Sequence, residues 1–195
     1  MTTETNVDSF EALEKLMLRQ RAKRIFDNRD VDDAMIERAI KVATYAPNGG
    51  NRQPTRYLVI RDRETKRKMG AIFDELGNSL IGHAPPERTP WEDVPVLVAV
   101  ITERSAGIAG AGGAVASVYP AVQNFLLAIQ GQGLGSVLTT RWKQREAEMN
   151  ALMGLPDDWE AHAILPVGWP ARKYGRGNRL PVAEVTYREQ FGKPW

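Results

Sequence analysis

The sequence has few of the residue types that most often bind metals or act as nucleophiles. It contains no cysteine and two histidines, His83 and His162, among 195 residues. The absence of cysteine excludes a disulfide scaffold, a thiolate metal site and a cysteine nucleophile. Two histidines so far apart in the sequence do not suggest a histidine-rich metal site. We therefore expect no metal centre.

The sequence also lacks long hydrophobic runs. The longest nearly uncharged apolar stretches cover residues 94–101 and 114–129, whereas a membrane-spanning helix needs about 20 apolar residues. Residues 1–9 are polar and acidic and carry no apolar segment of the kind found in a signal peptide. These features predict a protein with no membrane partner and a cytoplasmic location.

Charge is nearly balanced overall but unevenly distributed. The 26 basic and 24 acidic residues give a net charge of +2, which argues against a general nucleic-acid binder. Basic residues nevertheless cluster in residues 15–29 and 172–179. These clusters are either solvated surface charge or two halves of one anion site, because arginines remote in sequence can converge on a single phosphate.

The pattern of apolar residues predicts alternating helices and strands in one domain spanning residues 1–195. Helices are expected at residues 10–20, from Asp32 to Pro47, and at residues 64–80, 114–130 and 144–153; strands at residues 55–61, 94–102, 136–140 and 162–168. This interleaving indicates an α+β or α/β fold. The polar residues of the helix at 114–130 need partners inside the protein or across a subunit interface. The apolar residues of the tail at 169–195 are expected to pack on another surface.

Several catalytic motifs are absent. The sequence contains no phosphate-binding Gly-x-x-x-x-Gly-Lys-Ser/Thr loop and no Gly-x-Ser-x-Gly nucleophile elbow. The run Gly131-Gln-Gly-Leu-Gly-Ser136 lacks the third glycine of a dinucleotide fingerprint and lies between a helix and a strand, which is the wrong order. If the protein is an enzyme, an organic cofactor therefore supplies the difficult chemistry, and we expect no catalytic side chain.

Three segments resemble the motifs of a known family. The run Gln20-Arg-Ala-Lys-Arg-Ile-Phe26 is similar to an opening Arg-Arg-Ser-x-Arg-x-Phe, with Ala22 in place of serine. The run Ala46-Pro-Asn-Gly-Gly-Asn-Arg-Gln-Pro54 is similar to Ala-Pro-Ser-x-x-Asn-x-Gln-Pro. Residues 122–140 resemble a buried helix, a Gly-Leu-Gly turn and a strand facing the cofactor. Over nearly its whole length, the chain resembles the FMN-dependent nitroreductase family.

The resemblance implies a nitroreductase-like α+β fold with a central, mainly antiparallel sheet flanked by helices. It further implies an intertwined homodimer in which each FMN site is assembled from both chains. The cofactor-binding residues that it implies are Arg21, Ala22, Arg24, Pro47, Asn48, Gly49, Asn51, Gln53, Leu138, Thr139, Thr140, Arg176 and Arg179.

The resemblance also gives these residues roles. Arg21 and Arg179 would hold the FMN phosphate. Arg24 would lie near the pyrimidine edge of the flavin, where negative charge grows on reduction. The second segment would line the ring, partly from the partner subunit, and the backbone of residues 138–140 would reach the reactive edge.

The implied activity is oxidoreduction. Hydride from NAD(P)H would reduce the flavin, which would then reduce a nitroaromatic, a quinone or a similar small acceptor in the same cavity by a ping-pong mechanism. Residues 81–93 and 103–113 would select the acceptor. Two alternatives stay open: a protein that stores or senses FMN without turnover, and a specialised flavin enzyme of the same fold that cleaves a ring or removes a halogen.

Overall fold

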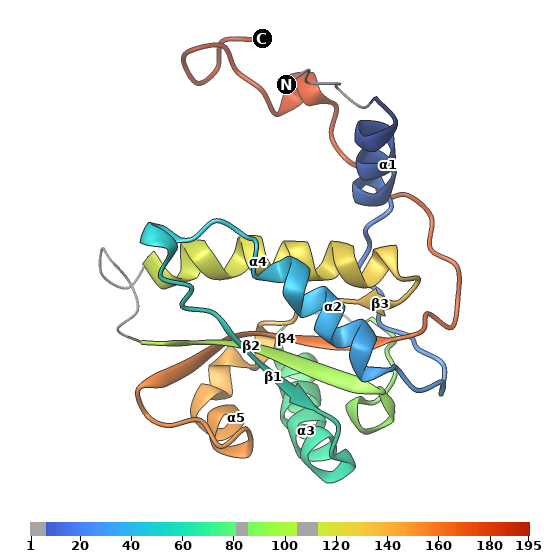
Figure 1. The fold of residues 1–195 in the computed structure, drawn as a ribbon, viewed down its shortest axis with the longest axis vertical. Helices are drawn as coiled ribbons and strands as arrows, with labels where there is room; N and C mark the ends of the chain where they lie inside the picture. Colours follow the sequence, from blue (N-terminus) through green and yellow to red (C-terminus); the bar gives the residue numbers. More distant parts are fainter. Residues whose placement is uncertain (1–6, 81–85, 105–112) are drawn as a thin grey trace.

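A four-stranded antiparallel sheet forms the centre of the protein (Figure 1). The computed structural model describes residues 7–80, 86–104 and 113–195. The strands lie in the order β1 (Arg56–Ile60), β2 (Val96–Glu103), β4 (Trp159–Gly168) and β3 (Gly135–Ser136). All three neighbouring pairs are antiparallel. The α+β class and the mainly antiparallel sheet expected from the sequence are confirmed.

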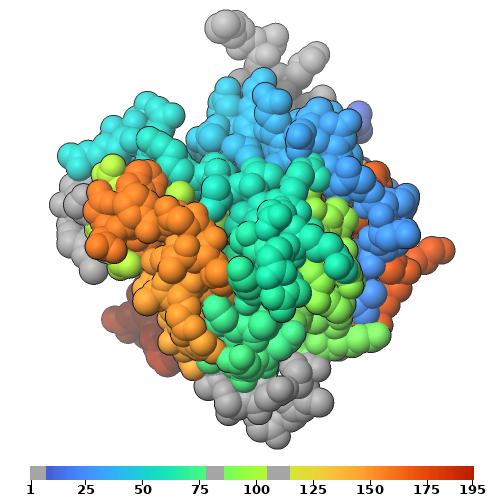
Figure 2. Space-filling view, turned by 90° about the horizontal axis from the view of Figure 1, so that it is seen from below, coloured from blue at the N-terminus to red at the C-terminus, as the bar shows by residue number. Residues whose placement is uncertain are grey.

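Helices cover both faces of this sheet. Helices α2 (Asp33–Ala43) and α4 (Gly113–Gly131) pack on one face, and α3 (Arg63–Leu80) and α5 (Glu146–Leu152) on the other (Figure 1). Figure 2 shows α3 and α5 side by side over their face of the molecule. Helix α1 (Val7–Leu18) stands beside this layered body and contacts α4. Short 3-10 turns complete the described chain: η1 (Gly49–Asn51), η2 (Trp91–Asp93), η3 (Arg141–Arg145) and η4 (Val182–Glu184).

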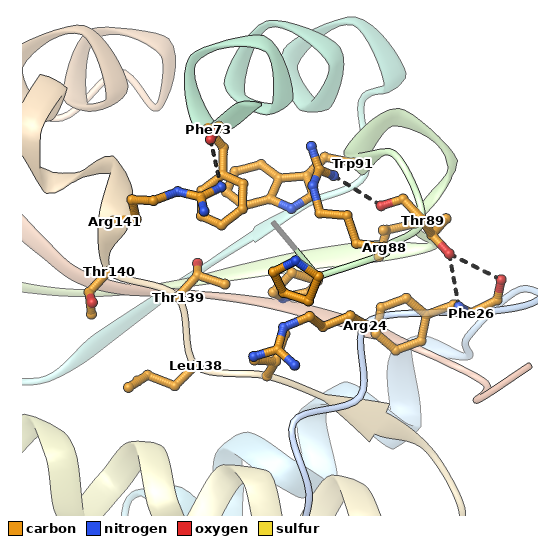
Figure 3. A pocket seen from close by; sticks show the side chains of 14 residues that line it. Arg24, Phe26, Phe73, Arg88, Thr89, Trp91, Leu138, Thr139, Thr140 and Arg141 are labelled. Carbon is orange, nitrogen blue, oxygen red and sulfur yellow. Dashed lines mark hydrogen bonds between the residues drawn. The ribbon is translucent and has the colours of Figure 1, made fainter. Parts of the chain in front are cut away.

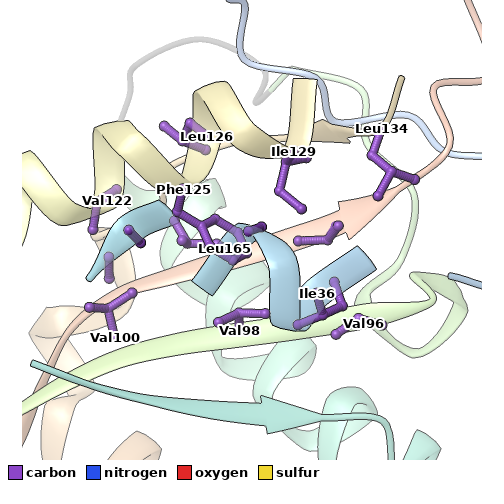
Figure 4. Packing of buried hydrophobic residues seen from close by; sticks show 14 of the residues in the cluster. Ile36, Val96, Val98, Val100, Val122, Phe125, Leu126, Ile129, Leu134 and Leu165 are labelled. Atoms are coloured by element: carbon purple, nitrogen blue, oxygen red, sulfur yellow. The ribbon is translucent and has the colours of Figure 1, made fainter. Parts of the chain in front are cut away.

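Strand β2 connects the two halves of the core. Successive side chains of a strand point to opposite faces, so Val96, Val98 and Val100 join the cluster under α2 and α4. The alternate residues Leu97, Ala99 and Ile101 join the cluster on the side of α3 and α5. Figure 4 shows the first cluster, with the valines of β2 facing side chains of α2 and α4. A strand covered on both faces reads as a continuous apolar run, which is why residues 94–102 could be identified as a strand.

The start of α2 follows from its capping residue. Asp32 has an extended backbone, and its side chain accepts a hydrogen bond from the backbone N–H of Ala34 at 2.9 Å. Such a cap satisfies one of the free N–H groups at the helix start and stabilises the helix by about 1 kcal/mol. The sequence expectation that the helix begins at Asp32 agrees with this boundary.

Two expected elements differ from the structure. The strand expected at residues 136–140 has only Gly135–Ser136 in the sheet, followed by an isolated bridge between Thr139 and Ile164. After Thr139 the chain turns into η3, where the backbone N–H of Lys143 donates to the carbonyl of Thr140 at 3.0 Å and the indole N–H of Trp142 donates to the carbonyl of Thr139 at 2.9 Å. The helix expected at residues 144–153 is therefore preceded by this turn and is α-helical only from Glu146 to Leu152.

The polar residues of α4 differ in their burial. Ser117 is buried, but Gln123 is exposed in the described chain. For Gln123, the expected partner across a subunit interface stays a prediction. None of the helices in the described part of the protein combines the length and apolarity that a membrane crossing requires.

Gly168, at the end of β4, lets the segment of residues 20–26 lie against the sheet. A Cβ atom at Gly168 would lie 2.9 Å from Cγ of Phe26 and 3.0 Å from its Cβ. Phe26 is itself buried and pairs with Pro170 in an isolated bridge. The backbone N–H of Lys23 donates to the carbonyl of Ser136 at 3.1 Å, which fixes the same segment to β3.

We expect Gly168→Ala to lower the free energy of unfolding by about 1–3 kcal/mol, because the buried ring of Phe26 cannot move away from the new methyl group. Gly175→Ala is the matched control, since nothing lies within 4 Å of a Cβ at Gly175, and it should change stability by less than about 0.5 kcal/mol. Urea unfolding of both variants measures the difference. Equal stabilities would show that the contact between Gly168 and Phe26 is not tight.

The C-terminal tail, residues 169–195, leaves the layered body and runs past α1 (Figure 1). Its apolar side chains are exposed in the single chain: Phe191 is 90% exposed and Trp195 is 69% exposed. Helix α1 likewise exposes apolar residues, including Phe10 and Leu13. Exposed apolar patches of this kind mark an interaction surface.

Candidate ligand site

Two arginines far apart in the sequence meet in the structure. Arg21 lies in the segment after α1, and Arg179 lies in the tail. A Cβ atom at Gly177 would lie 2.8 Å from Nη1 of Arg21 and 2.8 Å from Nη1 of Arg179, so both guanidinium groups lie against one backbone position. Neither arginine belongs to an ion pair in the described residues. Two like charges that converge without a carboxylate form a site for an anion such as phosphate.

The other expected arginine of the tail, Arg176, is exposed on the same stretch of chain. No hydrogen bond or ion pair joins its side chain to Arg21 or Arg179 in the described structure. Its expected role in cofactor binding stays a prediction.

The segment of residues 20–24 is extended, and its alternate side chains face different cavities. Gln20, Ala22 and Arg24 line a cavity of about 350 Å³ together with Leu138 and with residues of α4. Lys23 instead faces a basic groove on the other side. The structure therefore brings together Ala22, Arg24 and Leu138, three of the residues expected at the cofactor.

A second cavity, of about 270 Å³, adjoins the first at Arg24, Val137 and Leu138 (Figure 3). Thr139 and Thr140 also line it, so four of the expected residues border this space. The rest of its wall comes mostly from α3, from the segment before β2 and from η3, and includes Phe73, Arg88, Thr89, Trp91 and Arg141. We call this space the Arg24 cavity.

Hydrogen bonds fix Arg24 relative to this wall. The backbone N–H of Thr89 donates to the carbonyl of Arg24 at 2.9 Å, and the backbone N–H of Phe26 donates to the hydroxyl of Thr89 at 2.9 Å. The guanidinium of Arg24 is within 3.4 Å of the carbonyl of Ala22 and has no ion pair in the part of the chain that the structure describes. Its charge is therefore free to act on a ligand.

The loop of residues 46–54 lies apart from the Arg24 cavity. Asn48 and Gln53 line a third cavity, of about 340 Å³, with residues of α2, α4 and β1. Pro47, Gly49 and Asn51 are exposed. This third cavity shares no lining residue with the two cavities that Arg24 lines. One chain thus holds the expected site residues in two separate groups.

The backbone of this loop is strained. Gly50, Asn51 and Gln53 have φ values of 61°, 51° and 50°, in the left-handed region. A residue other than glycine costs about 1–3 kcal/mol in a sparsely populated conformation, which persists where the surroundings enforce it and is concentrated at functional sites. At Gln53, the side-chain oxygen of Asn48 accepts the backbone N–H at 2.8 Å and helps to hold this conformation.

His162 lies outside these cavities. It is a buried residue of β4, and its Nε2 lies 2.8 Å from the hydroxyl oxygen of Thr102 on β2. Burial lowers the pKa of His162 below its usual value, an effect that the nearby carboxylate of Glu160 partly opposes. This environment fits a structural histidine. His83 lies outside the described residues, as do residues 81–85 and 105–112 of the loops expected to select the acceptor.

Arg88 lies in the segment of residues 81–93 that was expected to select the acceptor, whereas the sequence did not point to Arg141 or Phe73 as site residues. Phe73 and Trp91 are buried and belong to the core cluster on the side of α3 and α5. Arg141 directly follows the expected residues Thr139 and Thr140. That adjacency was the available signal for Arg141.

An antiparallel α+β fold with a basic ligand cavity beside its sheet defines the general class of this protein. The chain belongs to the nitroreductase family, whose model matches residues 17–169. The iodotyrosine deiodinase of Thermotoga neapolitana is 32% identical over 145 residues, covering 68% of this chain and 74% of that protein. A protein of Archaeoglobus fulgidus, named provisionally as an NADH dehydrogenase/NAD(P)H nitroreductase, is 26% identical over 168 residues, covering 80% and 84% of the two chains.

Solved structures give the same fold. A crystal structure of oxidized iodotyrosine deiodinase bound to FMN and 3-iodo-L-tyrosine matches with a TM-score of 0.78 and 26% identity, covering 91% of this chain and 98% of the other. Nitroreductase A from Vibrio parahaemolyticus matches with a TM-score of 0.78 at 17% identity, covering 92% of this chain and 76% of that one. The second likeness shows the fold alone.

Proposed function

We propose that this protein is an FMN-dependent oxidoreductase that uses NAD(P)H to reduce a nitroaromatic, a quinone or a similar small acceptor. The observation that carries the proposal is the convergence of Arg21 and Arg179 on Gly177, because two unpaired guanidinium groups form a site that suits a phosphate. The names of relatives support the rest: one structure contains FMN, and one relative is named for NAD(P)H. Bound FMN would supply the redox chemistry by accepting a hydride and passing two electrons to the acceptor.

In this proposal, the residues of the chain bind and orient the cofactor. Arg21 and Arg179 hold the phosphate, with Arg176 as a third basic group in reach of solvent. Arg24, which has no ion pair in the described chain, provides a fixed positive charge that favours negative charge on the ring. Ala22 and residues 138–140 form the wall beside it.

We also propose that the site is completed in a homodimer. The loop with Pro47, Asn48, Gly49, Asn51 and Gln53 lies apart from the Arg24 cavity of its own chain, so a partner subunit would have to supply it. The exposed apolar residues of α1 and of the tail support the same assembly, since they would be buried by a second copy. The single-domain organisation and the cytoplasmic location stay predictions.

Reductive dehalogenation is the second candidate function. The name of the Thermotoga neapolitana relative, an iodotyrosine deiodinase at 32% identity, favours it. In that case the same flavin site would act on a halogenated aromatic, and the difference from a nitroreductase would lie in the residues that surround the acceptor.

The proposal is tested with the purified protein. We expect a yellow protein with flavin absorption bands that oxidises NADH or NADPH when menadione or a nitroaromatic is present. Double-reciprocal plots should be parallel, because both substrates use one cavity in turn. Release of iodide from 3-iodotyrosine would instead favour dehalogenation, and bound FMN without NAD(P)H oxidation would favour storage or sensing. A colourless protein that does not take up FMN would refute the proposed function.

A further inference from the structure

Three arginines line the Arg24 cavity, and the described part of its wall contains no carboxylate (Figure 3). Arg88 has a partner nearby, since its Nε donates to Asp74 at 3.1 Å. Arg24 and Arg141 have no ion pair among the described residues. The cavity thus carries excess positive charge. Neither Arg21 nor Arg179 lines it, so it is separate from the pair that would hold the FMN phosphate.

The guanidinium of Arg141 is held in a fixed position. Its central carbon lies 4.1 Å from the ring centroid of Phe73, and its Nη2 donates to the carbonyl of Phe73 at 2.8 Å. Phe73 in turn stacks on Trp91, with ring centroids 4.6 Å apart. Helix α3 makes room for this arrangement with a glycine, because a Cβ at Gly77 would lie 2.7 Å from Nη2 of Arg141.

This arginine is not satisfied by the protein alone. Its Nε is buried and has no hydrogen-bond partner in the described chain. Burial, together with the nearby charge of Arg88, lowers the pKa of Arg141. A buried donor without a partner and two like charges in close proximity are both unfavourable. An anion in the cavity would interact favourably with this cluster.

The remaining wall suits a flat apolar group. Val94, Val137, Leu138 and Pro166 contribute apolar surface. The volume of about 270 Å³ is at the low end for ligand sites and suits a single aromatic ring rather than a whole dinucleotide. A guanidinium group can pair with a carboxylate through two parallel hydrogen bonds.

We propose that the Arg24 cavity binds an electron acceptor that carries a carboxylate on its aromatic ring, and that Arg141 is the residue that selects this negative charge. For a nitrobenzoate, the nitro group would be reduced to a nitroso group and water, with the two electrons coming from NAD(P)H, which is oxidised to NAD(P)+, and with one further proton taken from solvent. This inference rests on the proposed function, because Arg24, Thr139 and Thr140 are the residues expected beside the flavin. Arg88 contributes charge, but its pairing with Asp74 makes it the weaker contact.

The first test is direct binding. Isothermal titration of the purified protein with benzoate and with benzamide compares ligands of the same shape with and without charge. We expect benzoate to bind at least about tenfold more tightly than benzamide. Equal affinities in the wild-type protein would overturn the proposal, whether or not any variant folds and whether or not the protein has oxidoreductase activity.

The second test uses Arg141→Gln, with 4-nitrobenzoate and 4-nitrobenzamide as acceptors. We expect kcat/KM for 4-nitrobenzoate to fall by about tenfold to a hundredfold and kcat/KM for 4-nitrobenzamide to change by less than about threefold. Arg141→Lys keeps the charge but not the paired donors, so it should recover part of the loss. The matched control is Arg145→Gln in the same turn, where the arginine pairs with Glu75 and Glu148 on the surface.

Two results would contradict the inference in this second test. An equal loss with both acceptors, or a loss of bound FMN in Arg141→Gln, would mean that Arg141 serves the cofactor rather than the acceptor. If the proposed function is wrong, the wild-type protein will reduce neither acceptor. The comparison of benzoate with benzamide would then still show whether the cavity prefers a negatively charged ligand.

Discussion

Replacing Arg21 or Arg179 with alanine is expected to weaken FMN binding by about tenfold to a hundredfold. Each substitution removes a charge-assisted hydrogen bond to the phosphate, worth about 1.5–3 kcal/mol, and each 1.4 kcal/mol is about tenfold in affinity. The measurement is a fluorescence titration of the apoprotein with FMN. Arg38→Ala, on the exposed face of α2, is the control for loss of one positive charge.

A third variant separates geometry from charge. Gly177→Ala keeps both arginines but places a methyl group 2.8 Å from Nη1 of each, so their side chains must move apart. Because those atoms are the ends of flexible side chains, stability should hardly change while FMN binding weakens. Unchanged FMN titrations for Arg21→Ala and Arg179→Ala would remove both arginines from the cofactor site.

Deleting residues 187–195 is expected to abolish dimer formation and to empty the cofactor site in the same protein. The deleted stretch contains Phe191 and Trp195, which are among the most exposed apolar side chains of the described chain. Burial of a large apolar side chain stabilises by about 1.5–3 kcal/mol, and a symmetric dimer buries each one twice. Sedimentation measures the dimer, and flavin absorbance measures the cofactor.

A single substitution makes this test sharper. Phe191 is 90% exposed, so Phe191→Ser should not change the folding of the chain itself. It should weaken the dimer by at least about tenfold, whereas Gln190→Ser, at the neighbouring exposed position, should leave it unchanged. A truncated protein that stays dimeric and keeps its full flavin content would contradict the proposed assembly.

The sequence predicted those elements whose signals are local. Strand β2 is an unbroken apolar run because both of its faces are covered, and α2 begins at Asp32 because that side chain caps the helix. The strand expected at residues 136–140 was mostly wrong, since the hydrogen bond from Trp142 to Thr139 depends on how the chain turns in three dimensions. The pattern of apolar residues along the sequence does not predict a hydrogen bond of this kind.

The candidate site likewise contains residues that could be predicted from the sequence and residues that could not. Arg21 and Arg179 were expected together because of the family resemblance, whereas Arg141 was not expected at all. Its partners Phe73 and Gly77 lie on α3, far away in the sequence. In the sequence, Gly77 is one glycine within the expected helix at residues 64–80. Only the folded chain shows that it makes room for an arginine.

The loop of Asn48 and the Arg24 cavity lie apart in one chain. In the proposed homodimer, a ligand that contacts the loop of one subunit and the cavity of the other would bind more tightly to the dimer than to the single chain. The factor by which such a ligand tightens subunit pairing must equal the factor by which pairing tightens the ligand. Dilution of the protein then releases the ligand, and an excess of ligand holds the subunits together. Occupancy of the site would thus depend on the amount of protein in the cell as well as on the supply of cofactor.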